Sequence, residues 1–193
     1  EEVKLIEGKP TLLTLARLEK RKGHEHILKA IVKLKKKYHN IRYIIAGEGK
    51  EKSYLKSLAD LLNISENVMF IGSINDGQKK FILKKTNLMI MPTLDESKKL
   101  SIEGFGITYI EAALFGIPSI ASNVGGTKEA VLHNETGIII DNLDKLEIAI
   151  VDLIENNIKM KKLGEKAKKR AEIQLSWTNI IKDYNKLIAE VNL

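Results

Sequence analysis

Short apolar runs alternate with helical patterns along this 193-residue chain, and this alternation constrains the fold more than any other feature. The runs are continuously apolar, which is typical of parallel strands that are covered on both faces. Between them, apolar residues recur at the three- and four-residue spacing of amphipathic helices. The predicted strands are residues 11–16, 42–46, 68–71, 88–91, 118–121 and 137–140, and helical spacing is clearest at Ile27, Ile31 and Leu34, at Leu55, Leu58 and Leu62, and at Leu146, Ile150 and Leu153.

Repetition of strand and helix produces right-handed crossovers and a parallel sheet. We therefore predict an α/β fold with a doubly wound parallel sheet of about six strands. After the last strand the pattern becomes helical only, at residues 144–156, 158–173 and 176–191. No proline- or serine-rich linker interrupts the chain, so residues 1–193 are expected to form one domain.

The composition excludes several classes of protein. Hydrophobic residues make up 44% and charged residues 30%, so a disordered or fibrous chain is excluded. The absence of cysteine excludes disulfides, thiolate nucleophiles and zinc–thiolate sites. No apolar run approaches the ~20 residues that cross a bilayer, and the first residues do not resemble a signal peptide. We therefore expect a soluble, cytoplasmic domain.

The net charge is +7, and basic residues form two dense clusters. One combines residues 20–22 with residues 35–37, and the other spans residues 159–170. Such clusters attract phosphate groups, anionic lipid or nucleic acid, although solvated helix faces have the same composition. Aromatic residues make up only 5% and do not alternate with the basic ones, which argues against nucleic acid. Peripheral contact with the inner face of a membrane stays open.

In open α/β sheets, ligands bind beyond the carboxyl ends of the strands, so the loops after the predicted strands are the first candidates for a site. One of them, Gly47-Glu-Gly49, resembles part of the dinucleotide fingerprint, but Lys52 stands where the third glycine belongs. It also follows the second strand, whereas that fingerprint follows the first. We therefore predict a tight strand-to-helix turn there and no nicotinamide site.

The segment Glu103-Gly-Phe-Gly-Ile-Thr-Tyr-Ile-Glu111 places two carboxylates eight residues apart. Its glycines disfavour a helix through the whole segment, so we expect the helix to begin near Gly106 or Ile107. Backbone N–H groups at a helix start bind anions, and the flanking carboxylates accept hydrogen bonds from hydroxyls. This layout suits a nucleotide-sugar, with a phosphate between two hydroxyl-bearing groups. A capping carboxylate and a surface glutamate would produce the same pattern.

The segment from Glu103 to Glu129 resembles the signature of the group 1 (family 4) glycosyltransferases. It contains a Glu-seven residues-Glu motif, a Gly-x-Pro strand and a Gly-Gly-x-x-Glu turn. The resemblance extends over nearly the whole chain, through residues 15–23, 45–49 and 68–72. In one departure, about ten residues separate Pro92 from Glu103 where many members have few, and this bears on the base and sugar contacts.

The resemblance implies the GT-B architecture, in which two Rossmann-like domains face each other across a cleft. This chain corresponds to the C-terminal, donor-binding half, and residues 176–193 would form a helix that crosses to the N-terminal domain. The implied activity is a retaining, metal-independent hexosyl transfer that uses no cofactor besides the nucleoside-diphosphate sugar. The acceptor, a saccharide or a lipid, would bind to the other half, so this half alone is expected to be inactive.

The resemblance also implies a role for individual residues. Arg17 and Lys22 would contact the donor pyrophosphate, although Arg17 has a second interpretation as a structural cation beside Glu19. Glu103 would be the catalytic residue that holds hydroxyls of the transferred sugar, and Glu111 would bind the ribose. The remaining expected contacts are Phe105, Gly106, Ile107 and Thr108 to the donor sugar and phosphate, and Ser73 and Ile74 to the base.

No metal site is expected. The chain has no Asp-x-Asp motif, and His24 and His26 lie beside a lysine-rich loop, where we expect them to be solvated. Two other functions stay open at this point. One is a nucleotide-sugar epimerase, which shares the fold but not this motif set, and the other is a non-catalytic module for nucleotide binding or membrane docking.

The last predicted helix is apolar over more than one stripe. An apolar surface of that width in water favours association. In this fragment we expect the helix either to fold onto its own domain or to pack against a second copy. The residues concerned are Trp177, Ile180, Ile181, Tyr184, Leu187, Ile188 and Val191.

Overall fold

The computed structural model describes residues 8–99 and 101–191. Its centre is a parallel sheet whose strands follow the predicted ones to within one residue at each end. The strands are β1 (Thr11–Leu15), β2 (Arg42–Ala46), β3 (Val68–Gly72), β4 (Leu88–Met91), β5 (Ser119–Ser122) and β6 (Gly137–Ile140). Their order in the sheet is β3-β2-β1-β4-β5-β6, which confirms the predicted doubly wound, Rossmann-like α/β fold.

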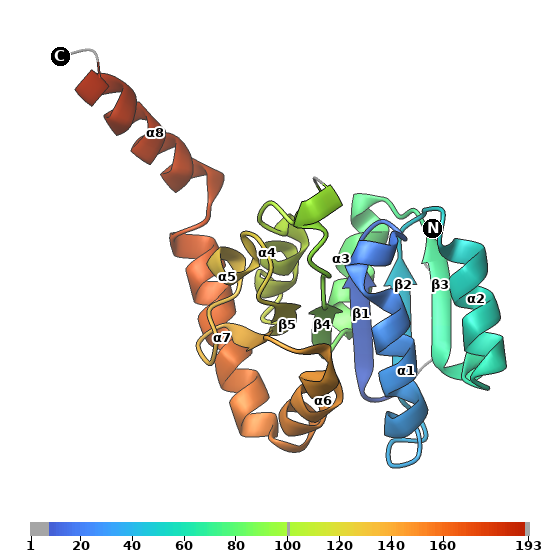
Figure 1. Ribbon diagram of the computed structural model, residues 1–193. Helices are drawn as coiled ribbons and strands as arrows, with labels where there is room; N and C mark the ends of the chain where they lie inside the picture. The colour runs from blue at the N-terminus through green and yellow to red at the C-terminus, as the bar shows by residue number, and fades with distance from the viewer. Residues whose placement is uncertain (1–7, 100, 192–193) are drawn as a thin grey trace.

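Helices cover both faces of the sheet (Figure 1). Leu12 belongs to the core under the first group of helices, and its neighbour Leu13 belongs to the core under the second. Consecutive strand residues point to opposite faces, so burial of both faces explains why the strands are continuously apolar. The first group is α1 (His24–Leu34), α2 (Lys52–Leu61) and α6 (Leu146–Glu155), and the second is α3 (Asp76–Lys85), α4 (Ile107–Ala113) and α5 (Thr127–Ala130).

Four short 3₁₀ turns complete the described secondary structure of the loops. The predicted helix over residues 144–156 divides into one of these turns followed by α6, and the boundary is a change from 3₁₀ to α geometry. The turns are η1 (Lys20–Lys22), η2 (Ser65–Asn67), η3 (Ser97–Lys99) and η4 (Leu143–Lys145).

The strand order reverses between β1 and β4, which pair side by side at the centre of the sheet. The loops after these strands therefore leave the same edge and diverge, which is where open α/β sheets bind ligands. Here the two loops contact each other, because the Leu94 N–H donates to the Arg21 carbonyl over 2.7 Å. Gly23 has φ +72°, and a Cβ on it would lie 2.2 Å from the Pro92 carbonyl oxygen, so only glycine fits there.

Gly47 and Gly49 form the predicted tight turn between β2 and α2. A Cβ on Gly47 would lie 2.0 Å from the Ala16 carbonyl oxygen, and a Cβ on Gly49 would lie 2.4 Å from that of Leu18. The Leu18 N–H donates to the Glu48 carbonyl over 2.9 Å. The two glycines therefore let the loop after β1 lie directly against the loop after β2.

The C-terminal helices are α7 (Asn157–Ile173) and α8 (Trp177–Val191). Helix α7 packs closely on the domain, since a Cβ on Gly164 would lie 2.0 Å from the Gly116 carbonyl oxygen. Helix α8 projects away from the domain (Figure 1), and Trp177 is 75% exposed. It therefore does not fold onto its own domain, which was one of the two predicted outcomes. In the described part of the chain, no helix is long and apolar enough to cross a membrane.

Candidate functional site

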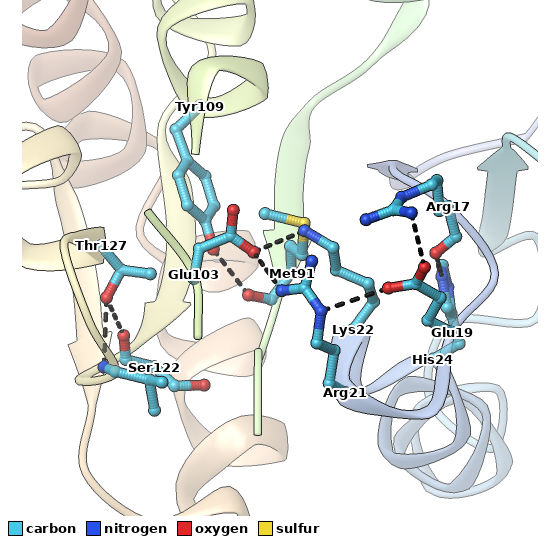
Figure 2. Close-up of polar contacts among 11 residues, drawn as sticks. Arg17, Glu19, Arg21, Lys22, His24, Met91, Glu103, Tyr109, Ser122 and Thr127 are labelled. Carbon is cyan, nitrogen blue, oxygen red and sulfur yellow. Dashed lines mark hydrogen bonds and ion pairs between the residues drawn. The ribbon is translucent and has the colours of Figure 1, made fainter. Parts of the chain in front are cut away.

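The reversal point of the sheet carries a cluster of charged residues around Glu103. The Glu103 side chain is buried, and its Oε2 accepts a hydrogen bond from Lys22 Nζ at 2.5 Å and from Arg21 Nη1 at 3.1 Å (Figure 2). Arg21 Nε also donates to Glu19 at 3.2 Å, and Glu19 pairs with Arg17 at 2.9 Å. We call these five residues the Glu103 clamp. It joins the loop after β1 to a loop about 80 residues further along the chain.

Two glycines hold the backbone of Glu103 in place. The Gly126 N–H donates to the Glu103 carbonyl at 3.1 Å. A Cβ on Gly125 would lie 2.1 Å from the same carbonyl oxygen, and a Cβ on Gly126 would lie 1.9 Å from that of Gly104. The Gly-Gly turn after β5 is therefore needed for the loop of Glu103 to pack against it.

Helix α4 begins where the sequence predicts. Gly106 precedes it with φ +87°, so Glu103 lies in the loop and Glu111 lies in the helix. The Tyr109 hydroxyl, 1% exposed, donates to the Met91 carbonyl at 2.7 Å and ties α4 to the end of β4 (Figure 2). Burial, and then the negative charge of Glu103, raise the pKa of Tyr109, so the phenol stays protonated.

Glu111 has a different partner, which we call the Glu111 clamp. Lys79 Nζ, from α3, donates to Glu111 Oε1 at 2.6 Å and lies 3.1 Å from Asp76. The hydrogen bond to Glu111, and then the one to Asp76, raise the pKa of Lys79. The side chains of Lys79 and Glu111 are 26% and 28% exposed, so solvent reaches this pair more readily than the Glu103 clamp.

His24 lies beneath the loop of the Glu103 clamp, and the prediction that it is solvated is wrong. It is 2% exposed because α1 begins under the loop, against the sheet. Its Nδ1 is 3.2 Å from the Tyr43 hydroxyl, its Nε2 is 3.3 Å from the Arg17 carbonyl, and Tyr43 contacts Thr14 at 2.8 Å. Burial lowers the pKa of His24 to about 4, although the contact to Arg17 opposes this. The ring is therefore neutral at pH 7. The described residues contain no group of three or more His, Asp or Glu side chains that could hold a metal ion.

The other predicted site residues lie at or near the same sheet edge. Arg17 is 71% exposed at its side chain and pairs with Glu19, so it lies at the outer end of the Glu103 clamp. Ser73 and Ile74 follow β3. Thr108 has a buried hydroxyl with no hydrogen-bond partner. The remaining three sit at the start of α4, where Phe105 is partly buried, Gly106 is buried and Ile107 is exposed.

Sequence reasoning missed Arg21 and Lys79. Arg21 is adjacent to Lys22 in the predicted phosphate-binding loop, and that adjacency was the available signal. Lys79 offered no signal, because it lies 32 residues from Glu111 on a helix with no recognised motif. The Glu103 clamp contains three cations and two carboxylates, so it keeps a net positive charge and can attract an anion.

The sequence model of the group 1 glycosyl transferases matches residues 1–170, and the chain belongs to this family. A GDP-mannose-dependent α-(1-6)-phosphatidylinositol monomannoside mannosyltransferase of Mycobacterium tuberculosis is 26% identical over 174 residues, which are 89% of this chain and 45% of that protein. An uncharacterized glycosyltransferase of Haemophilus influenzae is 33% identical over 150 residues, which are 76% of this chain and 40% of that protein. The chain thus spans a little under half the length of these relatives.

Solved structures share the fold. Anabaena HepE in complex with UDP and glucose superposes with a TM-score of 0.81 at 20% identity, covering 95% of this chain and 49% of HepE. The C-terminal domain of a group 1 family glycosyl transferase, LpcC from Francisella tularensis, superposes with a TM-score of 0.76 at 19% identity. That comparison covers 89% of each chain, so the fold described here matches a domain of similar extent.

Proposed function

We propose that this chain is the donor-binding half of a retaining, metal-independent glycosyltransferase, which moves a hexose from a nucleoside-diphosphate sugar to an acceptor. The observation that carries the proposal is the Glu103 clamp, which gathers cations beside a buried carboxylate at the reversal point of the sheet. The names of two similar proteins support a sugar-nucleotide donor, since one is GDP-mannose-dependent and HepE was solved with UDP and glucose.

The chemistry of the donor fits these residues. A diphosphate leaving group gains negative charge as the bond to the sugar breaks, and preorganised cations lower the barrier by about 3 kcal/mol for each good contact. Lys22 and Arg17 would supply that charge. Glu103 would accept hydrogen bonds from sugar hydroxyls, and Glu111 would do the same for the ribose. Thr108 would contact the donor from the start of α4, together with Phe105, Gly106 and Ile107.

The length of the relatives bears on what this chain can do by itself. The relatives are about twice as long, and we propose that the other half binds the acceptor, a saccharide or a lipid. This chain should therefore bind the donor and transfer nothing. Calorimetry with UDP-glucose, GDP-mannose and ADP-glucose tests this, with NAD as the control ligand. Binding of at least one sugar nucleotide but not of NAD supports the proposal, and binding of none contradicts it.

A nucleotide-sugar epimerase is the competing enzyme class. Product analysis of the full-length protein separates the two, because a transferase joins the sugar to an acceptor and an epimerase releases an altered donor. The family match to glycosyl transferases favours transfer.

We also propose a cytoplasmic location, with α7 as the face for peripheral contact with the inner membrane surface. Lys161, Lys162, Lys166 and Lys169 are exposed along this helix. Each basic residue near an anionic surface contributes about 1 kcal/mol of attraction. Sedimentation of the chain with liposomes, with and without anionic lipid, tests this. Equal recovery from both kinds of liposome contradicts the membrane contact, and with it the purely docking function.

Because α8 does not fold onto its own domain, we expect the isolated chain to associate with a second copy through this helix. Tyr184, Leu187 and Ile188 are each more than half exposed, which is costly for large apolar side chains in water. Light scattering over a concentration series should detect a dimer. Ile181→Asp with Ile188→Asp should reduce it, whereas Thr178→Asp with Asn185→Asp adds the same charge and should not. A chain that is monomeric at every concentration contradicts this proposal.

A further inference from the structure

Arg21 belongs to the Glu103 clamp and contacts the expected catalytic carboxylate, but the function proposed above assigns it no contact with the donor. Its Nη1 donates to Glu103 Oε2 at 3.1 Å, and its Nε donates to Glu19 Oε2 at 3.2 Å. The side chain is only 11% exposed. Its backbone is held as well, because the Arg21 carbonyl accepts the Leu94 N–H. Arg21 is therefore fixed at its backbone and at both sides of its guanidinium.

Lys22 and Arg21 share one oxygen of Glu103, but they differ in what they do when an anion enters. Lys22 reaches Glu103 with a single ammonium at the end of a flexible stem, so a phosphate oxygen can draw it away. The Arg21 guanidinium is planar and lies between two carboxylates, so turning toward a phosphate would break both contacts.

We infer that Arg21 is a positioning residue that holds the Glu103 carboxylate in place for the sugar while Lys22 turns to the donor diphosphate. This inference rests on the proposed function. It assigns Arg21 to recognition of the sugar part of the donor, through Glu103, and not to recognition of the phosphates. Loss of Arg21 should therefore weaken binding of a sugar nucleotide more than binding of the matching free nucleoside diphosphate.

The experiment compares these two ligands by calorimetry on the chain itself. The probes are UDP-glucose with UDP, GDP-mannose with GDP, and ADP-glucose with ADP, and the pair that the wild type binds is used for the variants. Arg21→Gln should lower the affinity for the sugar nucleotide about tenfold, which corresponds to one hydrogen bond to a charged group. It should lower the affinity for the free diphosphate less than about twofold. Lys20→Met is the matched control, because it removes one positive charge from an exposed position on the same turn.

Three further results bear on the inference. Lys20→Met should change both affinities by the same small factor. Arg21→Lys should rescue part of the sugar-specific loss, since an ammonium restores a charged contact to Glu103 but not the second contact to Glu19. Glu19→Gln should cause a smaller loss in the same direction, because it releases the far side of Arg21. The last two variants also decide the question if Arg21→Gln fails to fold.

Equal weakening of both ligands by Arg21→Gln would overturn the inference, because Arg21 would then act on the phosphates or through overall charge. Unchanged affinities would overturn it too. These failures differ from failure of the proposed function, in which the wild type binds no sugar nucleotide and no diphosphate.

Discussion

The Glu103 clamp and the Glu111 clamp lie at the two ends of one motif but bury their charges to different depths. The side chain of Glu103 is 10% exposed and pairs with both Arg21 and Lys22, whose side chains are buried to the same extent. The side chain of Glu111 is 28% exposed. Its partner Lys79 pairs with both Glu111 and Asp76, and the Asp76 side chain is largely in solvent. Charges inside the protein interact strongly and are costly to leave unpaired, whereas water screens the outer pair.

This difference separates a rigid part of the site from an adaptable one. The Glu103 clamp connects two loops and the Gly-Gly turn, so Arg21 and the loop backbone hold the Glu103 carboxylate before the ligand arrives, even where Lys22 turns to the donor. The Glu111 clamp connects two helices through one long side chain that is partly exposed, so Lys79 would leave at low cost if a ribose binds Glu111 as proposed. We expect substitutions in the first clamp to have the larger effects on stability and catalysis.

The largest expected effect is that of Glu103→Ala. In urea unfolding of this chain it should lower the free energy of unfolding by about 3 kcal/mol, because Arg21 and Lys22 would stay buried without their carboxylate. In the full-length enzyme the same change should lower kcat about a hundredfold, because the contact lies beside the breaking bond. Glu103→Gln keeps an acceptor and the side-chain volume, and it should recover part of the stability but not the charge pairing. A change in stability below about 1 kcal/mol would mean that the Glu103 clamp contributes no more to stability than the Glu111 clamp, which would contradict the prediction.

The second prediction concerns the acid sensitivity that His24 adds beneath the first clamp. The folded pKa of about 4 lies below the unfolded value of 6.5, so the unfolded chain binds more protons between these values. The stabilising effect of the neutral ring is complete above pH 6.5. This stabilisation should be lost as the pH falls, and the loss in the free energy of unfolding should reach about 3 kcal/mol at pH 4. Urea unfolding at pH 7, 5.5 and 4.5 measures this. The loss should be smaller in His24→Gln, and an identical pH dependence in the two proteins would contradict the assignment.

The third prediction concerns ligand binding at the second clamp. Glu111→Ala should weaken donor binding about tenfold with little change in kcat, because ribose contacts are similar in the ground and transition states. Steady-state kinetics of the full-length enzyme, with KM and kcat measured separately, compare it with Glu103→Ala. Equal losses of kcat in the two variants would remove the proposed division of labour.

The smallest effect is expected for Lys79→Met. The pair it breaks is partly exposed, and such pairs contribute less than about 1 kcal/mol to stability. Calorimetric affinity for the donor should stay within about threefold of the wild type, because the variant frees Glu111 for the ribose while removing a nearby positive charge. Destabilisation as large as that of Glu103→Ala would mean that the second clamp is as rigid as the first.

The sequence was a good guide to the helices and strands and to the edge of the sheet where the candidate residues gather. All six predicted strands are present, and α4 begins at Ile107, directly after the predicted glycine. It was a poor guide to which charges meet. Arg21 stands next to Lys22 in one basic run, and nothing in the sequence distinguishes their roles. His24 was predicted to be solvated because the residues around it are charged, but it is buried.

Local sequence patterns were enough to predict the doubly wound sheet, the turn glycines and the order of the motifs, because these depend on periodicity and on backbone conformations that few residues adopt. Three features follow from the packing of the folded chain: Arg21 and Lys22 contact one oxygen of Glu103, Lys79 contacts Glu111, and His24 is buried. Those contacts join segments 32 to 82 residues apart, except for His24, whose burial depends on how α1 packs on the sheet. Their partners are set by loop and helix packing, and no local pattern encodes that packing.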